Sequence, residues 1–169
     1  CPAAFCCVVV APPGVSRRQR DNGRMTTRIT TVCLGNICRS PIAAAVLAAE
    51  LADLDVEVDS LGTGGWHVGE GADPRAIAAL ERAGYDLEHT ARQASADVLA
   101  DSDLVLAMDS DNLEFLQALG VDAVLIRDFD PRGVGEDVPD PYYGTFAEFD
   151  EVVEMIQATV PGLRAHLEE

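Results

Sequence analysis

The sequence of 169 residues contains no lysine: all twelve basic residues are arginine, set against 29 acidic residues, for a formal net charge of −17. Residues 25–169 hold eight of those arginines and 28 of the acids. Such a surface repels nucleic-acid backbones and anionic membranes, so we expect neither as a partner. Any site for an anion must therefore be local, built from one arginine and backbone amides.

Long apolar runs are also missing. The run over residues 2–13 is about half of the roughly 20 residues that span a bilayer, and no comparable run follows. No positive region precedes it, whereas Arg17, Arg18 and Arg20 follow it, which is not the pattern of a signal peptide. We expect a cytoplasmic protein, with secretion left open but not indicated, in which residues 1–24 are a disordered extension and residues 25–169 are the folded domain.

Cysteine is confined to the first quarter of the chain, with none after Cys38. This distribution excludes a disulfide framework for the fold and favours a reducing compartment. The three histidines, His67, His89 and His166, are scattered singly, so the spacing predicts no metal site, and nothing indicates a cofactor.

Strand-like and helix-like segments alternate from residue 28 onward, which predicts an α/β fold of three layers: a four-stranded parallel sheet with helices on both faces. The segments with strand patterns are 28–34, 56–61, 104–108 and 123–127. The segments with helix patterns are 41–53, 74–83, 95–100, 110–119 and 146–167, the last broken or kinked at Pro161.

The stretch VCLGNICRSP, residues 32–41, joins the first strand to the first helix. Free N–H groups and the positive end of the helix dipole converge in such a loop, so the stretch predicts a phosphate-binding loop. Arg39 can bind the same anion with its planar fork. Gly35 permits close approach of the backbone, and Asn36 tolerates left-handed geometry.

Cys33 stands at the mouth of this loop, where a thiol has a chemical use. A free thiol is about 3% ionised at pH 7, and a helix N-terminus together with a guanidinium raises that fraction. Ser40 can stabilise the thiolate or assist its departure from phosphorus. The alternatives for Cys33 and Cys38 are core filling, half of a metal site, or a redox pair.

These residues resemble the signature of the low-molecular-weight protein tyrosine phosphatases. The resemblance extends over nearly all of residues 25–169 through four further motifs in the family's order. They are VDSLGTGGWHVG (58–69), HTARQ (89–93), AMDSDNL (107–113) and DPYYG (140–144). The resemblance implies the fold predicted above and the hydrolysis of protein phosphotyrosine and small aryl phosphates without a metal.

The resemblance also assigns the site. It makes Cys33 the nucleophile, Arg39 the ligand of the phosphoryl group, and Asp140 the general acid and base. The expected substrate-binding residues are Leu34, Gly35, Asn36, Ile37, Cys38, Ser40, Trp66, Tyr142 and Tyr143. The expected supporting network is Ser60, His89 and Asp109, although helix capping is an equal alternative for Asp109.

Two other functions remain open at this point. Arsenate reductases share this fold and loop but need further cysteines downstream of the loop, which this chain lacks. A phosphotyrosine-binding or redox-sensing module without catalysis is the second alternative. We further expect a phosphotyrosine protein as partner, a monomer or weak dimer, and a regulatory disulfide between Cys33 and Cys38 that protects the nucleophile from over-oxidation.

Overall fold

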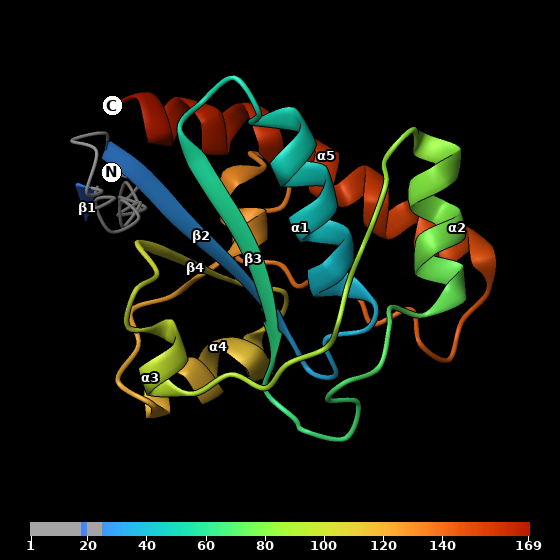
Figure 1. Cartoon of the computed structure of the whole chain (residues 1–169). Helices are drawn as coiled ribbons and strands as arrows, with labels where there is room; N and C mark the ends of the chain where they lie inside the picture. Colours follow the sequence, from blue (N-terminus) through green and yellow to red (C-terminus); the bar gives the residue numbers. More distant parts are fainter. Residues whose placement is uncertain (1–17, 20–24) are drawn as a thin grey trace, which may run out of the picture.

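A parallel sheet of four strands forms the centre of the molecule in the computed structural model, which describes residues 18–19 and 25–169 (Figure 1). The order across the sheet is β3, β2, β4, β5. The strands are β2 (Met25–Cys33), β3 (Val56–Gly62), β4 (Leu104–Ala107) and β5 (Val124–Leu125).

Helices cover both faces of this sheet, with α1, α2 and α5 on one side and α3 and α4 on the other (Figure 1). Their bounds are α1 (Arg39–Glu50), α2 (Pro74–Ala83), α3 (Ala96–Leu99), α4 (Ser110–Ala118), the 3₁₀ helix η1 (Ile126–Phe129) and α5 (Phe146–Glu168). The predicted three-layer α/β fold is therefore confirmed.

Each face of the sheet buries its own apolar cluster. Ile29 of β2 belongs to the larger cluster, with Ile42 of α1 and Phe149 of α5. Val32 of the same strand belongs to the smaller cluster, with Leu116 of α4. Ile29 and Val32 are an odd number of residues apart, so their side chains point to opposite faces and hold both helical layers.

The carboxyl end of β2 is the place where the chain changes direction across the sheet. Helix α1 leads to β3 on one side of β2, whereas the chain later returns to β4 on the other side. Ligand sites in open α/β sheets form at such a point, because the loops on either side diverge there. Cys33 is the last residue of β2.

The strands differ from the prediction at both ends of the sheet. Strand β2 begins three residues earlier than expected, and a two-residue strand, β1 (Arg18–Gln19), pairs antiparallel with its start. A pair of residues carries no periodic pattern, so the sequence did not indicate β1. The rest of the predicted disordered segment 1–24 lies outside the described residues. Strand β5 ends two residues early because Ile126 and Phe129 are buried on a 3₁₀ turn.

Helix α5 continues through Pro161, where the sequence predicted a break or kink. A proline inside a helix costs about 3 kcal/mol, but three buried apolar side chains, Ile156, Leu163 and Leu167, each return roughly 1.5–3 kcal/mol. Gly162 is needed here because a Cβ would lie 2.1 Å from the carbonyl oxygen of Phe129. Tertiary packing therefore outweighs the local signal of the proline.

Within the described residues, no helix combines the length and apolar character that crossing a bilayer requires.

Candidate active site

The loop from Leu34 to Cys38 curls around the sulfur of Cys33, between the end of β2 and the start of α1. The backbone N–H of Asn36 donates to Cys33 Sγ at 3.3 Å, and Ser40 Oγ lies 3.0 Å from the same sulfur. Cys33 is 2% exposed. The sulfur thus has one hydrogen-bond partner in the middle of the loop and one in the first turn of α1.

Asn36 fixes the shape of this loop from below. Its φ of 55° is left-handed, which asparagine tolerates better than most residues. Its Nδ2 donates to Ser40 Oγ at 2.9 Å and to Ser60 Oγ at 3.0 Å, while its Oδ1 accepts from the backbone N–H of Arg92 at 2.9 Å. Both amide donors and the acceptor are therefore used inside the protein.

His89 supports the same residue through its main chain. Its Nε2 lies 2.6 Å from the carbonyl oxygen of Asn36. Since a carbonyl oxygen only accepts, Nε2 carries the hydrogen. Burial lowers the pKa of His89, against the opposing effect of that hydrogen bond, so the ring is neutral near pH 7. Two of the residues expected to support the loop, Ser60 and His89, thus both bond to Asn36.

The hydroxyl of Ser40 has one hydrogen and two acceptors within reach. These are the sulfur of Cys33, at 3.0 Å, and the carbonyl oxygen of Leu61, at 3.3 Å. When Cys33 is a thiol, its S–H donates to Ser40, whose hydrogen then points to Leu61. When Cys33 is a thiolate, the hydrogen turns to the sulfur and stabilises the negative charge.

Gly62 brings the end of β3 against the loop. A Cβ at this position would lie 3.0 Å from Asn36 Cβ and from the carbonyl oxygen of Leu34. Any larger residue would push the two segments apart. In the sequence, Gly62 is one of several glycines of the motif over residues 58–69, and nothing there indicated this packing role.

Arg39 is buried, with 3% of its side chain exposed, and its guanidinium contacts both predicted acids. Nη1 donates to Asp109 Oδ2 at 2.5 Å and to the carbonyl oxygen of Val138 at 3.0 Å, and Nη2 donates to Asp140 Oδ2 at 3.3 Å. Burial works to lower the pKa of Arg39, but Cys33, Asp109 and Asp140 together raise it. The guanidinium is charged and its orientation is fixed.

Asp109 has both of the roles considered for it. Its Oδ2 accepts from Arg39, while its Oδ1 accepts from the backbone N–H of Asn112 at 2.8 Å and so caps α4. One carboxylate thereby connects the arginine to the start of a helix.

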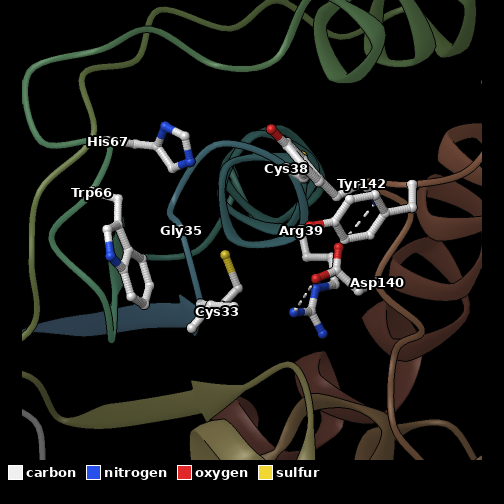
Figure 2. Close-up of a pocket in the computed structure, with 10 residues that line it drawn as sticks. Cys33, Gly35, Cys38, Arg39, Trp66, His67, Asp140 and Tyr142 are labelled. Atoms are coloured by element: carbon white, nitrogen blue, oxygen red, sulfur yellow. Dashed lines mark hydrogen bonds and ion pairs between the residues drawn. The ribbon is translucent and has the colours of Figure 1, made fainter.

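A cavity of about 240 Å³ opens above the loop (Figure 2). Cys33 and Arg39 lie deep in it, and Asp140, with 43% of its side chain exposed, stands on one side. Trp66, 73% exposed, faces Asp140 from the other side (Figure 2). The lining residues are Cys33, Leu34, Gly35, Cys38, Arg39, Trp66, His67, Asp140, Tyr142 and Tyr143.

The structure thus brings nine of the predicted site residues into one cavity wall. Asn36, Ile37 and Ser40 do not line it: their side chains are buried beneath the loop. That these three residues bind the substrate stays a prediction. For Asn36 and Ile37 the binding groups would be the backbone N–H groups.

Cys38 is buried in the wall beside Cys33, and its thiol behaves differently from that of a free cysteine. Burial, together with the neighbouring charges of Asp73, Cys33 and Asp140, raises its pKa to about 12, while the charge of Arg75 works in the opposite direction. The group is therefore a thiol at neutral pH. Both described cysteines are free in the structure, and the predicted disulfide stays a prediction.

Two residues near the cavity are not among those predicted from the sequence. His67 lines the cavity, with Nδ1 2.7 Å from Glu70 Oε2, and its position beside Trp66 was the available signal. Arg75 lies in the first turn of α2 and contacts the backbone that follows Asp140. A lone arginine on an amphipathic helix gave no signal of that role.

Metal ligation was not expected, and among the described residues no group of three or more histidine, cysteine, aspartate or glutamate side chains is placed to hold a metal ion. The reactive groups that line the cavity are the thiol of Cys33, the guanidinium of Arg39 and the carboxyl group of Asp140.

Comparisons of sequence agree with this arrangement. A family model described as "Low molecular weight phosphotyrosine protein phosphatase" matches residues 28–169. The low molecular weight protein-tyrosine-phosphatase of Streptomyces coelicolor is 48% identical over 157 residues, which cover 86% of this chain and 96% of the relative. Low molecular weight protein-tyrosine phosphatase A of Mycobacterium tuberculosis is 43% identical over 150 residues, 83% of this chain and 91% of the relative.

Comparisons of structure agree as well. A protein tyrosine phosphatase from Entamoeba histolytica superimposes with a TM-score of 0.80 at 30% identity, covering 85% of this chain and 97% of the other. A Drosophila arginine phosphatase gives a TM-score of 0.77 at 27% identity, covering 83% and 98%. With the family model spanning the domain and relatives above 40% identity, this chain belongs to the low molecular weight phosphotyrosine protein phosphatases.

Proposed function

We propose that the chain hydrolyses phosphotyrosine in proteins, and small aryl phosphates, through a phosphocysteine intermediate on Cys33. The observation that carries this proposal is the meeting of three groups in one cavity: the sulfur of Cys33, the charged fork of Arg39 and the carboxyl group of Asp140. Family membership supports the same activity.

The first step transfers the phosphoryl group to sulfur. Arg39 and the N–H groups of the loop bind the non-bridging oxygens, as the thiolate of Cys33 attacks phosphorus. A sulfur–phosphorus bond forms and the bond from phosphorus to the phenolic oxygen breaks. Asp140 gives its proton to that oxygen, so the leaving group departs as a neutral phenol.

The second step returns the enzyme to its starting state. Asp140, now a carboxylate, takes a proton from a water molecule, whose oxygen attacks phosphorus. The sulfur–phosphorus bond breaks, and inorganic phosphate and the thiolate of Cys33 result. The hydroxyl of Ser40, 3.0 Å from the sulfur, donates to the departing thiolate.

The walls of the cavity favour an aromatic substrate. Trp66 and Tyr142 flank the opening, and Tyr142 and Tyr143 pack edge to face with ring centroids 5.0 Å apart. Flat apolar walls suit the phenyl ring of phosphotyrosine, and the depth of the cavity disfavours the shorter phosphoserine.

We infer a cytoplasmic setting on separate grounds, because a nucleophilic thiol works only while it is reduced.

The test replaces the nucleophile. Cys33→Ser is expected to lower hydrolysis of p-nitrophenyl phosphate by at least about 10⁴-fold, because an un-ionised hydroxyl replaces a thiolate. Cys38→Ser, the matched removal of the other buried thiol, is expected to retain measurable turnover. Full turnover by Cys33→Ser would refute the proposed mechanism.

The same assay separates the substrate classes. Phosphotyrosine, phosphoserine and phosphoarginine peptides are compared, the last because an arginine phosphatase is among the similar structures. Arsenate with a thiol donor tests the reductase alternative. Arsenite production faster than aryl phosphate hydrolysis, or stable phosphopeptide binding without turnover, would overturn the proposal in favour of one of the two alternatives.

A further inference from the structure

Arg75 contacts the segment that carries the general acid. This segment, residues 139–144, is called the acid loop below. Nη2 of Arg75 donates to the carbonyl oxygen of Tyr142 at 2.9 Å, and Nη1 donates to that of Gly144 at 3.2 Å. A single guanidinium therefore holds the main chain of the acid loop at two points, two and four residues after Asp140.

The same guanidinium is held on its other side by Asp73. Nε donates to Asp73 Oδ1 at 3.0 Å and Nη2 donates to Oδ2 at 2.8 Å, which is a bidentate pair. The backbone N–H of Asp73 in turn donates to the carbonyl oxygen of Ile37 at 2.8 Å, within the phosphate loop. A continuous path of hydrogen bonds thus runs from the phosphate loop to the acid loop.

Tyr142 passes this connection on to the catalytic carboxyl group. Its backbone N–H donates to Asp140 Oδ1 at 3.1 Å, while its carbonyl oxygen accepts from Arg75. The peptide groups on both sides of Tyr142 are therefore bonded, one to the general acid and one to Arg75. If the peptide group that follows Tyr142 shifts, the peptide group before Tyr142 shifts with it, and so does the N–H that donates to Asp140.

Packing restricts the guanidinium to this place. Its central carbon lies 4.6 Å from the centre of the Phe149 ring and 5.7 Å from that of Tyr142. Phe149 is fully buried in the main core, so one of the two rings is itself immobile. Arg75 has 25% of its side chain exposed, against 46% for Arg82 on the same helix.

We propose that Arg75 is a positioning residue, which couples the phosphate loop to the acid loop and sets the place of Asp140 above the phosphoryl group. This inference rests on the proposed function, because it concerns the acid of that reaction. Arg75 does not line the cavity, and it acts through Asp140 rather than on the substrate.

The first experiment measures kcat/KM, which reports only the steps up to departure of the phenol, for aryl phosphates with good and poor leaving groups. Arg75→Met keeps a long side chain but removes the fork. We expect kcat/KM for phenyl phosphate to fall about tenfold or more and kcat/KM for p-nitrophenyl phosphate about twofold, because only the poorer leaving group needs a well-placed proton. Equal losses for the two substrates would overturn the proposal, since a general loosening of the site has no such preference.

A double-mutant cycle supplies the second readout. In an Asp140→Ala background, Arg75→Met is expected to change kcat/KM for phenyl phosphate by less than about twofold, because the residue through which it acts is gone. The same tenfold loss in both backgrounds would overturn the proposal. The proposed function would fail in a different experiment: the unaltered protein would not hydrolyse aryl phosphates, or its Cys33→Ser variant would hydrolyse them at the full rate.

The control variant is Arg82→Met. Arg82 also lies on α2 and also reaches across to α5, where it pairs with Asp150 at 2.6 Å beside the Phe146 ring, but it does not contact the acid loop. Arg82→Met should leave the ratio of the rates for the two substrates unchanged.

If Arg75→Met does not fold, Arg75→Lys replaces it. One ammonium group cannot make the four bonds of the guanidinium, so we expect the same dependence on the leaving group with a smaller loss of activity. A substrate-independent loss in Arg75→Lys would count against the proposal.

Discussion

The phosphate loop and the acid loop hold the two ends of the same substrate, but they are built in opposite ways. Asn36, at the centre of the phosphate loop, is 1% exposed and makes every hydrogen bond of its amide inside the protein. In the acid loop, Asp140 has 43% of its side chain exposed and Tyr143 is 95% exposed. The first region resembles a protein core, and the second is a surface held by a few main-chain bonds.

This difference follows the chemistry that each region has to perform. The phosphoryl group is the same in every substrate, so its donors can be fixed in advance and buried, where they cost no reorganisation during the reaction. The leaving group is part of a protein of unknown shape, which has to enter from solvent. An exposed acid loop admits it, and the connection through Arg75 keeps the proton donor in place.

The largest effect that would test this comparison is expected in the acid loop. Asp140→Ala removes the proton donor while the buried donors to phosphate remain. We expect kcat/KM for phenyl phosphate to fall about 10²-fold and that for p-nitrophenyl phosphate much less, with little change in the affinity for inorganic phosphate as an inhibitor. A matching loss of phosphate affinity would show that the two loops do not work separately.

Local sequence was sufficient to predict the phosphate loop, because its parts are contiguous. Cys33, Asn36, Arg39 and Ser40 lie within eight residues, and the end of a strand before a helix fixes where their groups point. Asp140 is 101 residues away from Arg39 and was reached only through the family resemblance. Its neighbours Pro139 and Pro141 carry no information about which strand end the loop approaches.

Contacts that depend on the backbone of a distant segment had no sequence signal. Arg75 bonds to carbonyl oxygens of the acid loop, which every residue possesses. A glycine is required at position 162 because the carbonyl oxygen of Phe129 lies against it. Helix α5 continues through Pro161 because its buried apolar side chains stabilise it by more than the lost hydrogen bond costs. The sequence therefore predicted the elements and the place of the phosphate loop well, and the connections between loops poorly.

A smaller effect, on stability, is expected in the phosphate loop. Asn36→Ala leaves Ser60 and the N–H of Arg92 without their buried partner and places alanine at a φ of 55°. We expect the free energy of unfolding to fall by about 1–3 kcal/mol, measured by urea denaturation, together with a loss of turnover for good and poor leaving groups alike.

Asn112→Ala is the matched control for that variant. Asn112 is 2% exposed, but in the described part of the chain its Oδ1 has no hydrogen-bond partner. Its removal should cost less stability than that of Asn36 and should leave the preference between leaving groups unchanged. Equal losses in the two variants would mean that burial of an amide, rather than the network around Asn36, stabilises the loop.

The smallest effect is expected from the protonation of His89. Burial lowers its pKa below the ordinary 6.5, so the unfolded chain takes up a proton at a higher pH than the folded protein does. The contribution of His89 to stability is therefore complete above about pH 6.5 and declines as the pH falls through the lower, folded pKa. His89→Gln offers an N–H donor to Asn36 that does not titrate. The free energies of unfolding of the unaltered protein and of His89→Gln are measured from pH 8 to pH 5, and they should converge as the pH falls, because carboxylates elsewhere contribute equally to both. Parallel curves would show that His89 is not held neutral beneath the phosphate loop.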